Sequence, residues 1–278
     1  TRTTEIVPRK FYTPDQIYQA VEKHLVQTRE KGDRVVYLTF VPDGEPTLDS
    51  RLSESIERLR PLGIPVAIIS NASLIWREEV RESLMKADWV SLKVDAIDET
   101  RWRRINRPHP SLDPQAILDG TSAFSDDFRG TLATESMIVK GLNDNDQAAN
   151  DLAGFLGKLG PDIAYLSVPT RPPAEKSVHA PDEATLNRVY QIVSRKVKNL
   201  ELLTGYEGNA FASTGDVAED LLSITSVHPM REEAVRKLLD KAGTHWRVVE
   251  QLIADEQLKL TEYEGRKFFV RLIPDKCE

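Results

Sequence analysis

The sequence is almost devoid of cysteine, since Cys277 is the one thiol among its 278 residues. A single thiol excludes a disulfide framework. No run approaches the roughly 18 to 20 apolar residues that a membrane-spanning helix requires, so we expect no membrane contact. Basic residues are also in deficit, with 37 Lys and Arg against 44 Asp and Glu and a net charge of -7. That balance argues against a broadly basic nucleic-acid surface.

Metal-ligand patterns are missing as well. The five histidines show no spacing typical of a metal site, and we assign no metal ligand in this chain. Charged residues make up 29% of the chain and hydrophobic residues 40%, as in a globular protein. The length suffices for one sizeable core and a small additional unit. We expect a cytoplasmic protein.

The most informative segment joins an apolar strand to a rigid turn. Residues 35–41 are almost wholly apolar or β-branched, as in a parallel strand covered on both faces. Gly44, Glu45 and Pro46 follow, and such a turn lets the backbone approach a ligand while Glu45 pairs with a cation such as an ammonium group. The alternative is an ordinary βα turn with a surface glutamate. If Glu45 faces an open site, replacing it by glutamine should change stability very little.

Strands alternate with helical segments along the first 205 residues, as in βαβ units. The expected strands are residues 35–41, 66–71, 89–95, 132–139, 163–168 and 200–205. The expected helices are residues 14–31, 48–62, 77–87, 114–124, 146–159 and 183–197. Parallel strands with right-handed crossovers form either an open sheet or a barrel, and periodicity alone does not choose between them.

The strand at residues 89–95 carries charges on one face. Its apolar residues share one side, so Ser91, Lys93 and Asp95 share the other. If the apolar side packs against helices, Lys93 and Asp95 point into the interior, where unpaired charge is costly. They therefore pair with each other or bind a ligand, and both alternatives stay open.

The segment after this strand is rich in arginine, with Arg101, Arg103, Arg104 and Arg107. Arginine favours planar, bidentate contacts with phosphate or carboxylate. Helical spacing would instead place several of them along a solvated stripe, which we prefer for Arg101 and Arg103. Arg107 is nearest the break at Pro108, and we expect it to contact substrate.

A second candidate substrate contact is Arg171, in a proline loop just past the strand at residues 163–168. It either closes on substrate or decorates a rigid loop. Both interpretations stay open.

From residue 216 the pattern changes to a small α+β unit. Helices are expected at residues 216–225, 230–242 and 244–255, with a hairpin of strands at 258–263 and 266–272. This is the outline of a winged helix, so we expect two domains, residues 1–212 and 213–278. Ten Lys or Arg stand against thirteen Asp or Glu in residues 216–278. Phosphate contacts dominate nucleic-acid affinity, so DNA is an unlikely partner, while RNA, a protein or a purely architectural role stay open.

Four groups of residues occur in the order and spacing of a known family: Gly44-Glu45-Pro46-Thr47-Leu48, Ile69-Ser70-Asn71-Ala72, Leu92-Lys93-Val94-Asp95-Ala96 with Ile105-Asn106-Arg107-Pro108, and Val139-Lys140-Gly141-Leu142-Asn143-Asp144. On these motifs the chain resembles the radical S-adenosylmethionine (SAM) superfamily. The resemblance covers nearly the whole chain. It implies an α/β fold, a partial TIM-like (β/α) barrel lacking its first strand, with its site at the carboxyl ends of the strands.

The resemblance also implies roles for particular residues. The turn of Gly44, Glu45 and Pro46 would hold the amino group of SAM. The strand-end residues Asn71, Lys93, Asp95 and Ser136 would hold its other polar groups, with Lys93 near a carboxylate and Asp95 near the ribose hydroxyls. Asn143 occupies a position where relatives often place a polar SAM contact. The substrate would lie above Lys93, Asp95 and Arg107.

One departure from the family pattern is severe. The superfamily's CxxxCxxC loop supplies three thiolates to a 4Fe-4S cluster, and this chain has one cysteine. We expect the cluster cysteines and the first strand upstream of Thr1. The alternative is a natural relative that has lost its cluster.

Two function classes follow. In its complete form the protein would be an oxidoreductase-type radical SAM enzyme that cleaves SAM to a 5′-deoxyadenosyl radical for hydrogen abstraction, with an electron donor such as a flavodoxin or ferredoxin. This chain alone would be inactive. The alternative is a cluster-free binding protein that contacts RNA or a protein partner through its winged-helix unit. The substrate, the reaction outcome and the oligomeric state do not follow from the sequence.

Overall fold

The computed structural model describes residues 5–30, 34–41, 44–173, 175, 177–204, 216–227, 229–263 and 265–272. Cys277 and the region from 205 to 215, which contains the expected domain boundary, lie outside the described residues. The chain divides into two compact units. The first comprises residues 1–21, 36–169 and 174–204, and the second comprises residues 22–35, 170–173 and 205–278.

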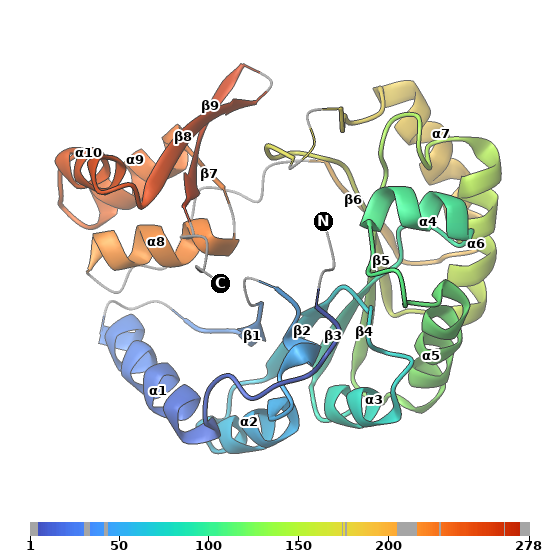
Figure 1. Cartoon of the computed structure of the whole chain (residues 1–278), viewed down its shortest axis with the longest axis horizontal. Coiled ribbons are helices and arrows are strands. Elements are labelled where there is room, and N and C mark those ends of the chain that lie inside the picture. Colours follow the sequence, from blue (N-terminus) through green and yellow to red (C-terminus); the bar gives the residue numbers. More distant parts are fainter. Residues whose placement is uncertain are drawn as a thin grey trace. The chain divides into compact units, whose positions relative to one another are not determined.

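The first unit is built on six parallel strands whose spatial order equals their order in the chain. They are β1 (Leu38–Phe40), β2 (Val66–Ser70), β3 (Trp89–Lys93), β4 (Thr131–Met137), β5 (Ile163–Ser167) and β6 (Leu200–Leu203). When every crossover has the same hand and moves one strand along, the connecting helices all fall on one face of the sheet. Figure 1 shows this arrangement, a curved sheet with helices outside. The order therefore favours a partial barrel over an open sheet with helices on both faces.

The helices and helical turns up to residue 194 are α1 (Pro14–Glu30), η1 (Pro46–Leu48), α2 (Leu52–Leu59), η2 (Arg60–Leu62), α3 (Glu78–Leu84), α4 (Glu99–Asn106), α5 (Pro114–Asp127), α6 (Asp146–Leu159) and α7 (Glu183–Ser194). Four of them, α4 to α7, begin at an Asp or Asn whose side chain caps the first turn, as Asn145 does for α6. The helix α4 covers the arginine-rich segment, in agreement with the helical spacing that we prefer for Arg101 and Arg103. Asp98 caps its start by accepting from the backbone N–H of Arg101 at 2.9 Å.

The hydrophobic core of this unit lies between the sheet and the helices. Ile56, Leu92 and Phe124 are completely buried in it, and burying one such side chain stabilises the fold by about 1.5 to 3 kcal/mol. Gly120 on α5 lets the helix approach the chain closely, since a Cβ there would lie 2.6 Å from the carbonyl oxygen of Ile75. The completely buried apolar residues of the central strands, such as Ile68, Val90 and Leu92, thus face the helices, and the other face carries polar residues such as Ser91 and Lys93.

The second unit contains three helices and a small antiparallel sheet of order β7-β9-β8. Its elements are α8 (Val217–Val227), β7 (Met230–Arg231), α9 (Glu232–Lys241), α10 (Arg247–Ala254), β8 (Leu258–Tyr263) and β9 (Arg266–Arg271). The hairpin and the helices lie where the periodicity predicts them. The sequence did not reveal β7, because its two residues are too few to show a period. Met230 and Phe269, which pair in register, are both buried in the core of this unit.

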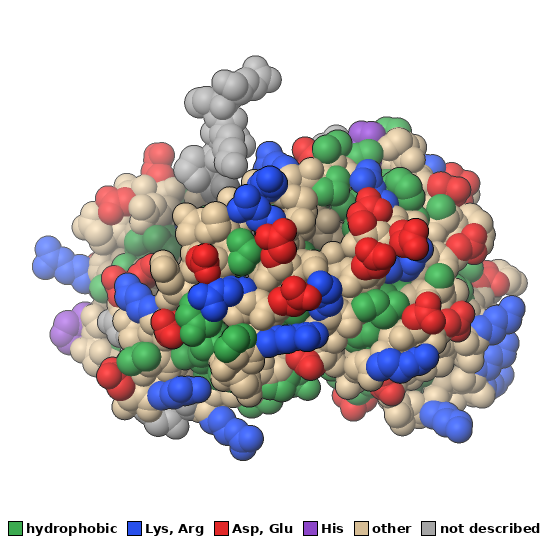
Figure 2. Space-filling view, turned by 90° about the horizontal axis from the view of Figure 1, so that it is seen from below, with side chains coloured by type: hydrophobic (Ala, Val, Ile, Leu, Met, Phe, Trp, Pro, Cys, Tyr) green, Lys and Arg blue, Asp and Glu red, His purple; other side chains and the backbone are tan. Residues whose placement is uncertain are grey.

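None of the helices in the described part of the chain is long and apolar enough to cross a membrane. The face drawn in Figure 2 shows basic and acidic side chains interspersed, without an area of one sign.

Candidate functional site

A cavity of about 210 Å³ lies at the carboxyl ends of β1 to β4. Its polar lining comes from four separate segments and includes Gly44, Glu45, Asn71, Ser91, Lys93 and Glu135. The parallel order of the strands explains this convergence, because their carboxyl ends meet at one edge of the sheet. A larger hollow of about 710 Å³ follows the outer helix α6, but none of the predicted site residues lines it. We therefore take the smaller cavity as the candidate site.

The carboxylate of Glu45 is embedded in the turn. One oxygen accepts hydrogen bonds from the backbone N–H and the hydroxyl of Thr47 and from the hydroxyl of Ser70, at 3.1, 2.8 and 2.7 Å. The other oxygen accepts from the backbone N–H of Asn71 at 2.7 Å. Burial raises the pKa of Glu45, and these hydrogen bonds oppose the increase. The side chain of Glu45 ties the turn after β1 to the end of β2, so we expect its replacement by glutamine to lower stability.

Gly44 and Asn71 are open toward the cavity. Apart from its chain neighbours, no atom of the described residues would lie within 4 Å of a Cβ added at Gly44. The Oδ1 atom of Asn71 accepts from the backbone N–H of Ser73 at 2.8 Å, and its Nδ2 atom has no partner among the described residues. Ala72 follows with a φ of 61°, a left-handed conformation that turns the chain sharply after β2. The open space at Gly44 and the Nδ2 atom of Asn71 are therefore available to a ligand.

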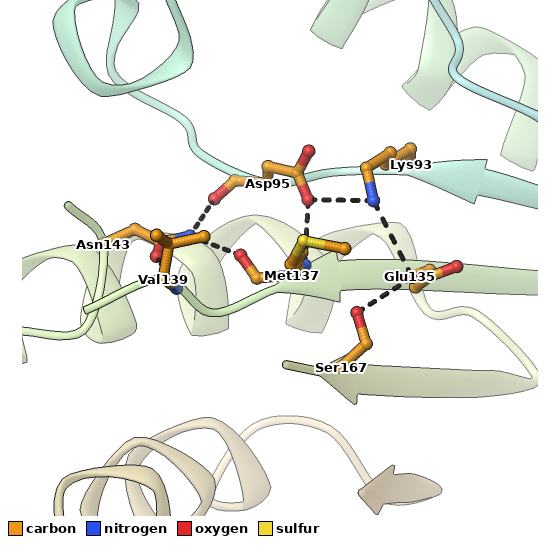
Figure 3. Close-up of polar contacts among 7 residues, drawn as sticks. All are labelled: Lys93, Asp95, Glu135, Met137, Val139, Asn143 and Ser167. Atoms are coloured by element: carbon orange, nitrogen blue, oxygen red, sulfur yellow. Dashed lines mark hydrogen bonds and ion pairs between the residues drawn. The ribbon is translucent and has the colours of Figure 1, made fainter. Parts of the chain in front are cut away.

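Lys93, Asp95 and Glu135 form a charged cluster at the ends of β3 and β4 (Figure 3). The ammonium of Lys93 lies 3.5 Å from Asp95 and 3.7 Å from Glu135. Burial lowers the pKa of Lys93, but the two carboxylates outweigh it and the pKa is raised, so Lys93 is protonated. Ser167 donates to Glu135 at 2.8 Å and holds that carboxylate in place from β5.

Asp95 is satisfied on one oxygen only. Its Oδ1 atom accepts from the backbone N–H of Met137 at 2.8 Å, whereas Oδ2 is buried without a hydrogen-bond partner among the described residues. Burial raises the pKa of Asp95, and Lys93 and the Met137 N–H oppose the increase. An unpartnered buried carboxylate oxygen is costly. The ion pairs of the cluster therefore satisfy the charge of Lys93, whereas one oxygen of Asp95 is left without a hydrogen-bond partner in the described part of the chain.

Asn143 is a structural brace. Its Nδ2 atom donates to the carbonyl oxygens of Asp95 and Met137 at 2.8 and 2.9 Å, and its Oδ1 atom accepts from the backbone N–H of Val139 at 2.8 Å. Figure 3 shows that these contacts join the segments that follow β3 and β4. All three hydrogen bonds go to the backbone, so Asn143 positions the strand ends.

Ser136 lies on the opposite face of β4 from Glu135. Side chains alternate along a strand, so Glu135 faces the cavity and Ser136 faces the helices. Its hydroxyl is completely buried and has no hydrogen-bond partner among the described residues. The structure does not bring Ser136 into the site. Reasoning from the sequence missed Glu135, although its position two residues before Met137 in an alternating strand is a usable signal.

The two predicted substrate contacts lie outside this cavity lining. Arg107 ends α4 with a left-handed φ of 43° and forms an ion pair with Glu175. Arg171 lies in the loop after β5, in a segment that belongs to the second unit. Their contact with substrate stays a prediction.

Fold and cavity first define a class of protein, a parallel barrel-type α/β protein with polar residues gathered where such barrels hold their active sites. The sequence pattern of the radical SAM superfamily matches residues 2–156. UPF0026 protein MJ1312 of Methanocaldococcus jannaschii is 42% identical over 270 residues, 96% of this chain and 84% of that protein. A UPF0026 protein of Helicobacter pylori is 28% identical over 234 residues, 84% of this chain and 74% of that protein. The chain belongs to the radical SAM superfamily and, within it, to the UPF0026 family.

Solved structures agree on the fold. The crystal structure of Streptococcus suis SuiB bound to S-adenosylmethionine superposes with a TM-score of 0.53 at 16% identity, over 76% of this chain and 49% of that chain. At this identity the likeness concerns the fold alone.

Proposed function

We propose that this chain is the SAM-binding part of a radical SAM enzyme and that the cavity at the ends of β1 to β4 holds SAM. The observation that carries the proposal is the convergence of Glu45, Asn71, Lys93 and Glu135 around one cavity in a member of this superfamily. SAM carries an ammonium, a sulfonium and a carboxylate. The cavity offers carboxylates for the cations and Lys93 for the carboxylate.

Several features of the site fit SAM. Gly44 leaves open space above the turn, where the backbone can approach the amino group. Asp95, which pairs with the cavity residue Lys93, has a buried oxygen without a hydrogen-bond partner among the described residues, and we assign that oxygen to a ribose hydroxyl. The cavity of about 210 Å³ is smaller than the roughly 300 to 1,000 Å³ of most ligand pockets. It therefore suits one end of SAM, with the remainder lying along the inner face of the sheet.

The residues of this chain bind and orient, and bound SAM supplies the reductive cleavage and hydrogen abstraction of this superfamily. Protonated Lys93 fixes the carboxylate, while Asn143 holds the ends of β3 and β4 in register around the ligand. The cluster does not fit this chain, since one cysteine is too few for three thiolate ligands. Among the described residues, no three His, Cys, Asp or Glu are grouped as a metal site. In the complete enzyme, an electron donor such as a flavodoxin or ferredoxin would supply the electron for SAM cleavage.

The second unit keeps its proposed identity as a winged-helix domain over residues 213–278. Its order of helix, short strand, two helices and hairpin is the observation that favours this interpretation. The exposed face of α10 carries Arg247 and Glu250, one charge of each sign. Such a face suits contact with RNA or a protein better than binding along the phosphate backbone of DNA. This unit would provide the partner contact in the alternative, cluster-free function.

Equilibrium dialysis of labelled SAM against the 278-residue chain tests the proposal. We expect saturable binding that Lys93→Met weakens about tenfold, a loss of about 1.4 kcal/mol. Lys158→Met, an exposed lysine on α6, is the matched control and should bind SAM as the wild type does. Absence of saturable binding, or equal affinity in both variants, would refute the proposal.

A separate experiment distinguishes the enzyme from the cluster-free binding protein. If the gene encodes CxxxCxxC before Thr1, the longer protein should turn brown on anaerobic reconstitution and cleave SAM under reduction. An upstream region without cysteines would favour the binding-protein function.

A further inference from the structure

Two glutamates line the candidate cavity, Glu45 and Glu135, and the protein occupies their carboxylates to different degrees. The carboxylate of Glu45 receives four hydrogen bonds on its two oxygens. A carboxylate has about four lone-pair sites, so the surrounding turn takes up nearly all the accepting capacity of Glu45. Although Glu45 lies at the wall of the cavity, it is poorly placed to accept a further hydrogen bond from a ligand.

Glu135 is open on one oxygen. Its Oε1 atom accepts from the hydroxyl of Ser167 at 2.8 Å and lies 3.7 Å from the ammonium of Lys93 (Figure 3). Its Oε2 atom has no hydrogen bond or ion pair among the described residues, and 31% of the side chain is exposed. Glu135 therefore has accepting capacity left at the cavity, while Ser167 holds the carboxylate in place.

The charged cluster has more carboxylates than cations. Asp95 and Glu135 share the ammonium of Lys93, at 3.5 and 3.7 Å. Within the described part of the chain, no other cationic side chain forms an ion pair with either carboxylate. One lysine between two carboxylates leaves a negative charge in a partly buried site, where unpaired charge is costly. A ligand that brings a cationic group to the cavity would offset this charge.

The register of the sheet places opposite charges side by side at the cavity. Lys93 on β3 and Glu135 on β4 are register partners, and both line the cavity. Register partners in a parallel sheet point to the same face. The amino and carboxylate groups of an α-amino acid are attached to one carbon, so a site that binds both needs an anion and a cation close together. Glu135 and Lys93 provide such a pair.

We infer that Lys93 and Glu135 form a clamp for the amino-acid end of SAM, in which Glu135, rather than Glu45, accepts from the α-amino group and Lys93 pairs with the α-carboxylate. The inference rests on the proposed function, since it takes SAM as the ligand of this cavity. The backbone of the turn at Gly44 stays free to approach the same amino group, whereas the carboxylate of Glu45 holds the turn. Ser167 is a positioning residue, because it holds Glu135 and does not line the cavity.

The test compares two thioethers, S-adenosylhomocysteine and 5′-S-(3-carboxypropyl)-5′-thioadenosine, which is the same molecule without its amino group. Equilibrium dialysis gives the ratio of their dissociation constants for each protein. We expect the wild type to bind the deaminated analogue about tenfold more weakly, and Glu135→Gln to bind the two analogues within about twofold of each other. Glutamine keeps an acceptor for the Ser167 hydroxyl, so the variant should fold. Glu82→Gln, which removes the same charge from the exposed side of α3, should keep the wild-type ratio.

The possible failures are distinguishable. Each ratio is measured on one protein, so a partly unfolded variant does not change it. Equal binding of the two analogues by the wild type, or a tenfold ratio retained in Glu135→Gln, would overturn the clamp. Loss of the ratio in Glu45→Gln alone would assign the amino group to Glu45 instead.

Two further outcomes concern the sulfonium and SAM itself. If Glu135→Gln lost SAM affinity but kept its affinity for S-adenosylhomocysteine, or if the wild type bound SAM and neither thioether, the sulfonium would be the recognised group and the clamp would be wrong. Absence of saturable SAM binding by the wild type would instead overturn the proposed function, whatever the thioethers show.

Discussion

The turn after β1 and the end of β3 each contribute one buried carboxylate to the same site, and the two carboxylates differ in what the protein supplies to them. Glu45 receives four hydrogen bonds from the protein, on both oxygens. Asp95 receives one backbone hydrogen bond and an ion pair on Oδ1, and nothing reaches Oδ2 within the described residues. A carboxylate that the protein satisfies mainly stabilises the fold, whereas the buried, unsatisfied oxygen of Asp95 costs stability unless another group reaches it.

The largest expected effect concerns Glu45→Gln. An amide has one acceptor oxygen where the carboxylate has two, so at least one of the buried donors from Thr47, Ser70 and Asn71 loses its partner. We expect a loss of about 1 to 3 kcal/mol in the free energy of unfolding, measured by urea denaturation. Glu82→Gln is the control and should stay within about 0.5 kcal/mol of the wild type. Equal stability of the two variants would contradict the structural role of Glu45.

Asp95→Asn should show the reverse balance. The amide keeps an acceptor for the Met137 N–H, so stability should fall by less than in Glu45→Gln. The charge and one acceptor facing the proposed ribose are lost, and we expect SAM affinity to decrease about tenfold. Dialysis and urea denaturation on the same sample measure both quantities. A variant that loses stability but keeps its SAM affinity would place Asp95 with Glu45 as a structural carboxylate.

Gly44→Ala tests whether SAM occupies the space at the turn, because the substitution adds a methyl group and changes no charge. The new methyl group meets no atom within 4 Å in the described part of the chain beyond its own neighbours, so stability should be unchanged. If SAM lies against this turn, the methyl group takes its space, and affinity should decrease about fivefold, or about 1 kcal/mol. Unchanged SAM affinity would show that the ligand does not approach Gly44.

The smallest expected effect is a shift in the pKa of Tyr165 on β5, which pairs in register with Glu201 on β6. The carboxylate of Glu201 contributes to the raised pKa of Tyr165, so Glu201→Gln should lower that pKa toward the ordinary value of about 10. Because the folded pKa of Tyr165 is raised, its contribution to stability is present below pH 10 and is lost as pH rises through the folded pKa. Tyrosine ring signals followed from pH 8 to pH 12 report the shift. An unchanged pKa would mean that Glu201 does not face Tyr165.

Much of the fold follows from local pattern. The six strands and the helix at Asp146–Leu159 lie where periodicity predicts them, because apolar residues must cover one face of each element. The helix α4 has no apolar face, since its residues are largely charged and none of them is buried, so only the spacing of its arginines indicates it. The strand β7 escaped prediction, because two residues carry no period.

The residues of the candidate site also divide into those that the sequence predicts and those that only the tertiary structure reveals. Alternation along residues 89–95 suffices to pair Lys93 with Asp95, and the motifs suffice to mark Gly44, Glu45 and Asn71. Only the tertiary structure decided that Glu45 is held by the protein, and that Glu135, Tyr165 and Glu201 lie in register on neighbouring strands. Sequence determines which side chains share a strand face, whereas register between strands determines which of them meet, and register depends on packing between residues that are distant in the chain.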